Sequence, residues 1–274
     1  YSYIEPRSGK GPVVVFGINE FVQKITNSLT LGNIAELEEI AKMHGVSFNS
    51  EGFVSLFHKY KGTNEFPLVV RGVPEGTVVA VGTPVASIIN SDPEFPWLTS
   101  FFETLFLRCV WYPSTVASVS RQCKVVIKEA LERTGDVAGL PFKLHDFGAR
   151  GVSSGESAAI GGAAHLINFQ GSDTIEGIHY IRVSHDTSLN HDYMPAFSID
   201  ATEHSTVTSW GRGGEEDMYE NFLREHGAPG KIFACVSDSW NIWKALDKWK
   251  ALEPVLLEVG GTLVVRPDSG DPID

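Results

Sequence analysis

Residues 231–268 read KIFACVSDSWNIWKALDKWKALEPVLLEVGGTLVVRPD, and this stretch decides the class of fold. A short apolar run is followed by a segment with helical spacing of apolar residues, and then by a second short apolar run. A strand, a helix and a strand in this order predict a right-handed βαβ unit, because parallel strands need a long crossover connection.

The same alternation extends back to residue 142. Apolar runs separated by helical stretches recur as FKLHDFG (142–148), HLINF (165–169) and AFSID (196–200). This pattern predicts an α/β fold with a parallel sheet or barrel. Ligands of such folds bind at the carboxyl ends of the strands, so the residues directly after each run are the candidates for a site.

Helices dominate the pattern before residue 66. Residues 12–25 begin as a strand and become helical, residues 33–44 have one apolar face, and residues 50–60 form a further short helical pattern. Asn33 is a plausible N-cap of the second helix, and Gly45 ends it.

A small β-rich segment follows at 66–89, where valines are interrupted by Pro-Glu-Gly and Gly-Thr-Pro turns. Two helices are then expected at 97–109 and 114–134, with Pro113 in the first turn of the second. We therefore expect a mixed α+β domain over 1–135 and an α/β domain over 136–274.

The composition limits the classes of function. The chain has 274 residues, of which 42% are hydrophobic and 20% charged, and its net charge is −12. Such a chain repels nucleic acid and anionic membranes, so an anionic ligand needs a few local cations. Cys109, Cys123 and Cys235 fit neither a disulfide framework nor a zinc site and are expected to fill space. The polar start, YSYIEPRSGKG, lacks the apolar core of a signal peptide, so a reducing, cytoplasmic location is expected.

Three residues after the first two runs are candidates for ligand binding. Phe147 lies beside Gly148 at the end of its run and, if its ring is exposed, could stack on a flat heterocycle. Arg150 could bind phosphate. Asp173 could accept a hydrogen bond from a ligand amide. The alternatives are a turn with a buried ring and a surface arginine, and an aspartate that caps the following helix.

The later runs are followed by a histidine, an arginine and aspartates. His204 could act as a base or accept a phosphoryl group, although a single histidine is more often structural. Arg266 suits a diphosphate, and Asp268 suits sugar hydroxyls or Mg²⁺, while the alternative is a turn with a surface ion pair. For the segment VSDS (236–239), helix capping is favoured over ligand binding. Taken together, these residues suit a phosphorylated sugar and an aromatic base.

At these positions the chain resembles the nicotinamide phosphoribosyltransferase family. The segments HDFGARGVSS, INFQGSDT, ATEHSTVTSWG, CVSDSWNIW and LVVRPDSGDP occur in that family's order and near its spacing, as do VPEGTVVAVGTPV and NSDPEFPWLTSFFETLFLRCVWYPSTVA. The resemblance covers nearly the whole chain. It implies an irregular α/β barrel, here incomplete, with a smaller mixed α+β N-terminal domain.

The resemblance also implies a reaction, a pentosyl transfer. Nicotinamide displaces diphosphate from 5-phosphoribosyl 1-diphosphate and gives nicotinamide mononucleotide, with Mg²⁺ on the diphosphate and ATP as co-substrate through a phosphohistidine at His204. Phe147 would stack on the base and Asp173 would bind its carboxamide. The resemblance gives His204 and Asp268 the catalytic roles. It assigns the diphosphate or amide to Arg150 and Arg266, the diphosphate also to His204, the ribose to Asp268, and the lining of the pocket to Ser198. It assigns no metal ligand among these side chains.

Several features depart from the family pattern. Asn241 stands where relatives usually carry Asp, and Ala149 where many carry Tyr. Relatives are homodimers with shared active sites, to which an N-terminal tyrosine and a C-terminal half contribute, and these segments are not in the sequence. The chain starts without Met and ends at Asp274 in a loop-like stretch, so we expect a longer protein and little activity from these residues alone.

Three alternatives remain open on sequence grounds. The first is a nicotinate phosphoribosyltransferase, which has a similar reaction. A carboxylate at Asp173 argues against it, because it would attract an amide and repel the carboxylate of nicotinate. The second is a truncated, inactive paralogue that serves as a binding partner. The third is an unrelated barrel enzyme acting on a sugar phosphate, which would make the ordered motifs a coincidence.

Overall fold

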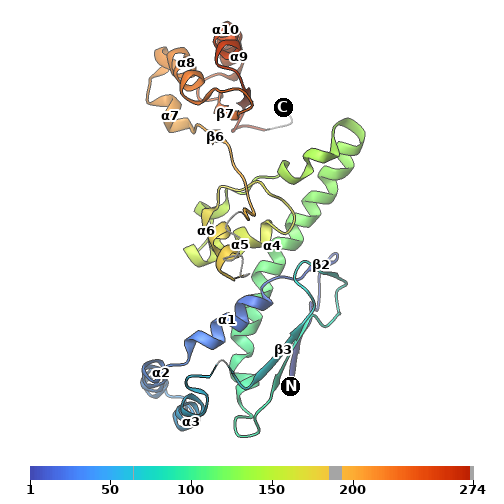
Figure 1. The fold of residues 1–274 in the computed structure, drawn as a ribbon, viewed down its shortest axis with the longest axis vertical. Helices are drawn as coiled ribbons and strands as arrows, with labels where there is room; N and C mark the ends of the chain where they lie inside the picture. The colour runs from blue at the N-terminus through green and yellow to red at the C-terminus, as the bar shows by residue number, and fades with distance from the viewer. Residues whose placement is uncertain (64, 185–192, 272–274) are drawn as a thin grey trace. The chain divides into compact units, whose positions relative to one another are not determined.

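The chain folds into two compact units in a computed structural model that describes residues 1–63, 65–184 and 193–271 (Figure 1). The first unit is Tyr1–Phe197 and the second is Ser198–Asp274. Each unit is considered by itself below. The predicted domain boundary at 135/136 concerns the whole protein and stays a prediction.

Two small antiparallel sheets form in the first unit. One has the order β1-β5-β3, with β1 at Ser2–Ile4, β3 at Leu68–Gly72 and β5 at Ala86–Asn90. The other pairs β2 (Val13–Val14) with β4 (Val78–Val79). The short strands predicted within 66–89 are confirmed. Gly76 and Gly82 adopt positive φ angles in the turns between them, where other residues would be strained.

Three helices follow β2 along the chain, namely α1 (Ile18–Ser28), α2 (Leu31–His44) and α3 (Ser50–Tyr60). The predicted N-cap of α2 is wrong by three residues. Thr30 caps the helix because its hydroxyl accepts a hydrogen bond from the backbone N–H of Asn33, at 3.1 Å. Gly45 ends α2 with φ 86°, as predicted.

A single helix, α4 (Leu98–Thr134), replaces the two helices predicted at 97–109 and 114–134. Pro113 lies in its interior and is buried. The next residue, Ser114, binds the backbone of Phe16. Its Oγ accepts a hydrogen bond from Phe16 N at 3.0 Å and donates one to Phe16 O at 3.1 Å. Gly17 packs against the carbonyl of Cys109. This carbonyl has no helical hydrogen bond from residue 113, because proline lacks a backbone N–H. Tertiary contacts therefore accompany the continuation of α4 through the proline.

The segment after α4 contains two short 3₁₀ helices, η1 (Val137–Phe142) and η2 (Gly148–Gly151), and the helices α5 (Gly155–His165) and α6 (Ile175–Ser184). The predicted run HLINF is not a strand. It continues from the end of α5 as a turn, in which the N–H groups of residues 166–169 bond to carbonyls of residues 162–165. Isolated parallel bridges Asp146–Ser172 and Gly171–Phe197 remain where strands were predicted.

The second unit holds a parallel sheet in the order β6-β7-β8. The strands are β6 (Asp200–Ala201), β7 (Ile232–Val236) and β8 (Thr262–Arg266). The helices are α7 (His204–Thr208), α8 (Glu215–His226), α9 (Ile242–Ala251) and α10 (Glu253–Val259), with a 3₁₀ turn, η4, at Arg212–Gly214. Residues 231–268 form two parallel strands with a helical connection, which confirms the strand–helix–strand prediction. Among the described residues no sheet closes into a barrel.

Side chains of α8, α9 and the sheet form the core of the second unit. Tyr219 and Trp249 stack with ring centroids 4.1 Å apart, and Phe222 packs on Phe233. Cys235 is buried here, as Cys109 is in the first unit, and burial raises the pKa of these thiols to about 11 and about 12 respectively. Both act as small apolar residues, as predicted. Within the described part of the chain, no helix has both the length and the apolar character to cross a bilayer.

Candidate functional site

One group of residues in the first unit is called the Asp173 cluster and consists of His145, Phe147 and Asp173, while the predicted residue Arg150 follows in η2. His145 Nε2 lies 3.0 Å from Asp173 Oδ1, and the rings of His145 and Phe147 have centroids 4.6 Å apart. The Asp146–Ser172 bridge aligns the two segments, because Asp173 N donates to Asp146 O at 2.9 Å. The predicted ring and carboxylate are thus joined through a histidine that the sequence analysis had not selected.

Exposure favours the ligand-binding interpretation of Phe147. Its side chain is 53% exposed and not buried in a turn, and Arg150 in η2 is also exposed. Gly171 leaves room for the imidazole of His145, since a Cβ there would lie 2.8 Å from His145 Nδ1 and the ring would have to move. His145 is therefore confined by Gly171 on one side, the Phe147 ring on another, and the Asp173 carboxylate at its tip.

A second group follows the carboxyl ends of β6, β7 and β8 and is called the His204 cluster, consisting of His204, Asp238, Arg266, Asp268 and Ser269. The parallel register places these positions together, as expected for strand ends. His204 Nε2 lies 2.9 Å from Asp238 Oδ1, and His204 Nδ1 lies 3.7 Å from Asp268 Oδ2. The predicted residues His204, Arg266 and Asp268 are brought together, around an aspartate that was expected to cap a helix.

Asp238 has the densest hydrogen bonding in the His204 cluster. Its Oδ2 accepts from Asp268 N at 2.8 Å, from Ser269 N at 2.7 Å and from Ser269 Oγ at 2.7 Å, and its side chain is only 9% exposed. Burial alone would raise the pKa of this carboxyl, but the hydrogen bonds from Ser269, Asp268 and His204 outweigh it and lower the pKa well below the usual range. Asp238 is therefore ionised at neutral pH.

Capping of α9 belongs to another residue. Asn241 Oδ1 accepts from Lys244 N at 2.9 Å, so the expectation that the segment 236–239 caps this helix is wrong. Asn241, which stands where the family usually has Asp, is therefore the N-cap of α9. The sequence signal that could have separated these roles is position, because an N-cap directly precedes the helix whereas Asp238 lies three residues earlier.

Arg266 ends β8 and reaches across the sheet. Its Nη2 donates to Thr202 O at 3.2 Å, and its Nε lies 3.4 Å from Asp268 Oδ1. The side chain of Arg266 is 26% exposed and that of Asp268 43%, so both present polar atoms to solvent. Ser198 is exposed and lies two residues before β6.

The described residues offer few ligands to a divalent metal ion. No group of three or more His, Cys, Asp or Glu side chains is arranged to hold a metal in the described ranges. Both oxygens of Asp238 already accept hydrogen bonds, which leaves Asp268 as the half-exposed carboxylate of the His204 cluster. These residues fit an ion that arrives with its own phosphate ligands and not one held in a protein cage.

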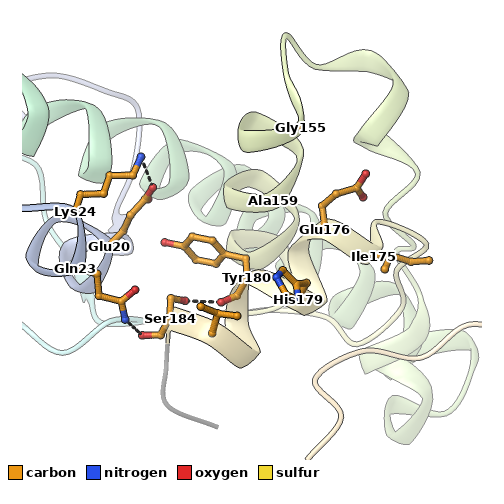
Figure 2. A pocket seen from close by; sticks show the side chains of 11 residues that line it. Glu20, Gln23, Lys24, Gly155, Ala159, Ile175, Glu176, His179, Tyr180 and Ser184 are labelled. Atoms are coloured by element: carbon orange, nitrogen blue, oxygen red, sulfur yellow. Dashed lines mark hydrogen bonds and ion pairs between the residues drawn. The ribbon is translucent and has the colours of Figure 1, made fainter. Parts of the chain in front are cut away.

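A pocket of about 920 Å³ lies elsewhere in the first unit (Figure 2). Side chains of α1, α5 and α6 line it, including the Glu20–Lys24 ion pair at 2.8 Å and Gln23, whose Nε2 donates to Ser184 O at 2.7 Å. None of the predicted site residues lines this pocket. We therefore place the candidate site by the chemistry of the two clusters and not by the size of this cavity.

The parallel sheet, with the His204 cluster after its strands, places the second unit in the α/β class of folds, in which ligands bind at the carboxyl ends of the strands. Residues 142–274 match the model of the nicotinate phosphoribosyltransferase (NAPRTase) family. A protein of Xanthomonas campestris named nicotinamide phosphoribosyltransferase is 42% identical over 100% of this chain and 58% of that protein. The chain belongs to the nicotinate phosphoribosyltransferase family.

Other relatives agree with this assignment. A nicotinamide phosphoribosyltransferase of Acinetobacter baylyi is 33% identical over 81% of this chain and 45% of its own length. The crystal structure of human nicotinic acid phosphoribosyltransferase is similar in fold, with a TM-score of 0.62 and 18% identity, over 98% of this chain and 56% of that chain. The chain thus spans between about half and three fifths of the length of these proteins.

Proposed function

We propose that the protein carrying this chain transfers the phosphoribosyl group of 5-phosphoribosyl 1-diphosphate to nicotinamide, giving nicotinamide mononucleotide and diphosphate on the route to NAD. The observation that carries the proposal is the 42% identity, over 100% of the chain, to a protein with that name. The Asp173 cluster supports the choice of base, because it offers a carboxylate beside an exposed aromatic ring.

The Asp173 cluster would hold the base. The Phe147 ring stacks on the pyridine ring, and Asp173 accepts a hydrogen bond from the carboxamide NH₂. His145 fixes the orientation of Asp173 through Oδ1. A carboxylate at this position would repel nicotinate, which carries a carboxylate in place of the amide.

The His204 cluster would hold the phosphorylated sugar. Arg150, His204 and Arg266 bind the diphosphate, Asp268 accepts hydrogen bonds from ribose hydroxyls, and Ser198 lines the substrate pocket. Charge develops on the leaving diphosphate while the anomeric carbon becomes oxocarbenium-like. Catalysis by these residues therefore consists of placement and charge stabilisation.

Magnesium and ATP complete the proposed reaction. Mg²⁺ would neutralise charge on the diphosphate, and Asp268, the more exposed of the two carboxylates in the His204 cluster, could supply one oxygen ligand. ATP would phosphorylate His204, with a bond forming from a ring nitrogen to the γ-phosphorus and ADP leaving with the electrons of the broken P–O bond. We further propose an irregular α/β barrel, a homodimer with shared active sites and a cytoplasmic location for the whole protein.

The test is a competition assay of the full-length protein with 5-phosphoribosyl 1-diphosphate and Mg²⁺, offering nicotinamide and nicotinate side by side. Selective formation of nicotinamide mononucleotide supports the proposal. Turnover of nicotinate in its place would overturn the assignment of the base, and failure of both bases to react would favour a non-catalytic paralogue that acts as a binding partner. The mass of the protein in solution tests the dimer.

Replacement of the selecting carboxylate is expected to reduce discrimination between the bases. Asp173→Asn keeps one oxygen, replaces the other by an NH₂ group, and removes the negative charge that opposes nicotinate. We expect the ratio of kcat/KM for nicotinamide over nicotinate to fall about tenfold, which corresponds to about 1.4 kcal/mol.

The matched control is Asp200→Asn. Asp200 also pairs with a histidine, His226 Nδ1 at 3.2 Å, and its side chain is 50% exposed against 42% for Asp173, but it lies outside both clusters. The control should leave the preference unchanged. An Asp173→Asn protein with the parent's preference would refute the role of Asp173 in choosing the base.

Removal of the stacking ring is expected to weaken base binding. Phe147→Ala should raise the KM for nicotinamide about two- to tenfold, because aromatic stacking contributes about 0.5–1.5 kcal/mol beyond area burial. Phe142→Ala is the control, since both phenylalanines are 53% exposed and lie in the same segment. The measurement is the steady-state KM for nicotinamide of both variants. Equal KM values for Phe147→Ala and Phe142→Ala would show that Phe147 does not contact the base.

A further inference from the structure

The carboxylate of Asp238 connects the three segments that follow β6, β7 and β8. It lies just after β7, bonds to His204 after β6 through Oδ1, and bonds to residues 268–269 after β8 through Oδ2. With four hydrogen bonds and a side chain that is 9% exposed, its orientation is fixed from both sides. On sequence grounds alone, helix capping was favoured over ligand binding for the segment that contains this residue.

The hydrogen bond to Asp238 decides which nitrogen of His204 carries a proton. An ionised carboxylate only accepts hydrogen bonds, so His204 Nε2 must carry the hydrogen. In the neutral imidazole, Nδ1 then carries the lone pair. The nearest acidic group to Nδ1 is Asp268, whose Oδ2 lies 3.7 Å away, beyond the reach of a direct hydrogen bond. Nδ1 is therefore the nitrogen available to an electrophile.

We propose that Asp238 is the positioning residue of His204: it selects the Nε2–H tautomer, directs Nδ1 toward the phosphoryl donor, and holds the Asp268–Ser269 loop beside it. The chemistry at His204 rests on the proposed function, whereas the tautomer does not. In the phosphorylation step the Nδ1 lone pair forms the N–P bond, the P–O bond to ADP breaks, and ADP leaves with that electron pair. The charge that develops on the ring is stabilised by Asp238.

The same carboxylate couples the histidine to the ribose-binding loop. Loss of the Asp238 side chain would release both His204 and the amides of residues 268–269, so an alanine variant cannot separate the two effects. Two other variants can. In Asp238→Asn the amide oxygen accepts from the loop while the NH₂ group faces His204 Nε2. Two donors then meet, and His204 must shift to the Nδ1–H tautomer. Ser269→Ala removes one loop hydrogen bond and leaves the bond to His204 intact.

The first measurement is ¹⁵N NMR on the full-length protein labelled with [¹⁵N]histidine. The His204 signals are identified by their absence in His204→Gln. We expect the Nε2–H tautomer in the parent and in Ser269→Ala, and the Nδ1–H tautomer in Asp238→Asn. An Nδ1–H tautomer in the parent would overturn the proposal, and this readout stands even where Asp238→Asn fails to fold.

The second measurement is the rate at which phosphate from γ-labelled ATP enters the protein. Loss of a carboxylate that orients a histidine costs from about 10-fold to about 10⁴-fold, so the phosphorylation rate of Asp238→Asn should fall at least about tenfold. Asp200→Asn, which removes the carboxylate that pairs with His226 outside both clusters, should keep the rate of the parent. A tautomer switch without a fall in rate would refute the positioning role. A parent protein that takes up no phosphate would refute the phosphohistidine of the proposed function, while the NMR result would still decide the tautomer.

Discussion

His204→Ala is expected to abolish the stimulation of turnover by ATP while basal turnover falls much less. The imidazole is the described nucleophile of the His204 cluster, and alanine offers no atom that could accept the phosphoryl group. Substrate placement by Arg266 and Asp268 does not require that imidazole. The measurement is initial rate with and without ATP, at saturating nicotinamide and 5-phosphoribosyl 1-diphosphate.

The control for this experiment is His226→Ala. His226 lies at the end of α8, pairs with Asp200 in a bond like that between His204 and Asp238, and has the same side-chain exposure of 42%. The hydrogen bond from His226 lowers the pKa of Asp200, so the control removes a comparable histidine–carboxylate pair outside the cluster. ATP stimulation that survives in His204→Ala at the level of the His226→Ala control would exclude a phosphohistidine at this position.

Gly17→Ala is expected to lower the free energy of unfolding by about 3 kcal/mol or more. Gly17 has φ 102°, and a Cβ there would lie 2.0 Å from the carbonyl oxygen of Cys109 and 2.8 Å from Pro113 Cγ. Overpacking typically costs about 1–3 kcal/mol, and an alanine at positive φ adds about 1–2 kcal/mol. The contact with α4 would have to open by moving one of two backbones.

Gly45→Ala separates the two contributions. Gly45 also has a positive φ, 86°, but a Cβ there would meet nothing within 4 Å. This variant should therefore lose only the conformational part, about 1–2 kcal/mol. Urea unfolding followed by circular dichroism gives both values. Equal destabilisation by the two substitutions would mean that Gly17 is needed for its φ alone and that α1 does not depend on close approach to Pro113.

The sequence identified part of each cluster and missed one residue in each. Phe147, Asp173, His204, Arg266 and Asp268 follow apolar runs, and this position alone made them candidates. Asp238 occupies a similar position but was assigned to helix capping, which is the more common role there, and His145, inside its apolar run, was given no role. The contacts between His145 and Asp173 and between His204 and Asp238 join residues 28 and 34 positions apart. Such pairs depend on the register of parallel segments, which local sequence does not encode.

Local patterns determined the strands within 66–89, the helix ending at Gly45 and the strand–helix–strand order of residues 231–268. In each case the deciding property is the conformational preference of nearby residues, such as glycine at positive φ or valine in an extended chain. Tertiary structure alone decided that α4 continues through Pro113 and that HLINF turns at the end of α5. It also decided that Asp238 binds a histidine in place of a helix terminus. Burial against Phe16, the close approach of Gly17 and the parallel register outweigh local preference there, because they act on groups that are distant in sequence and adjacent in space.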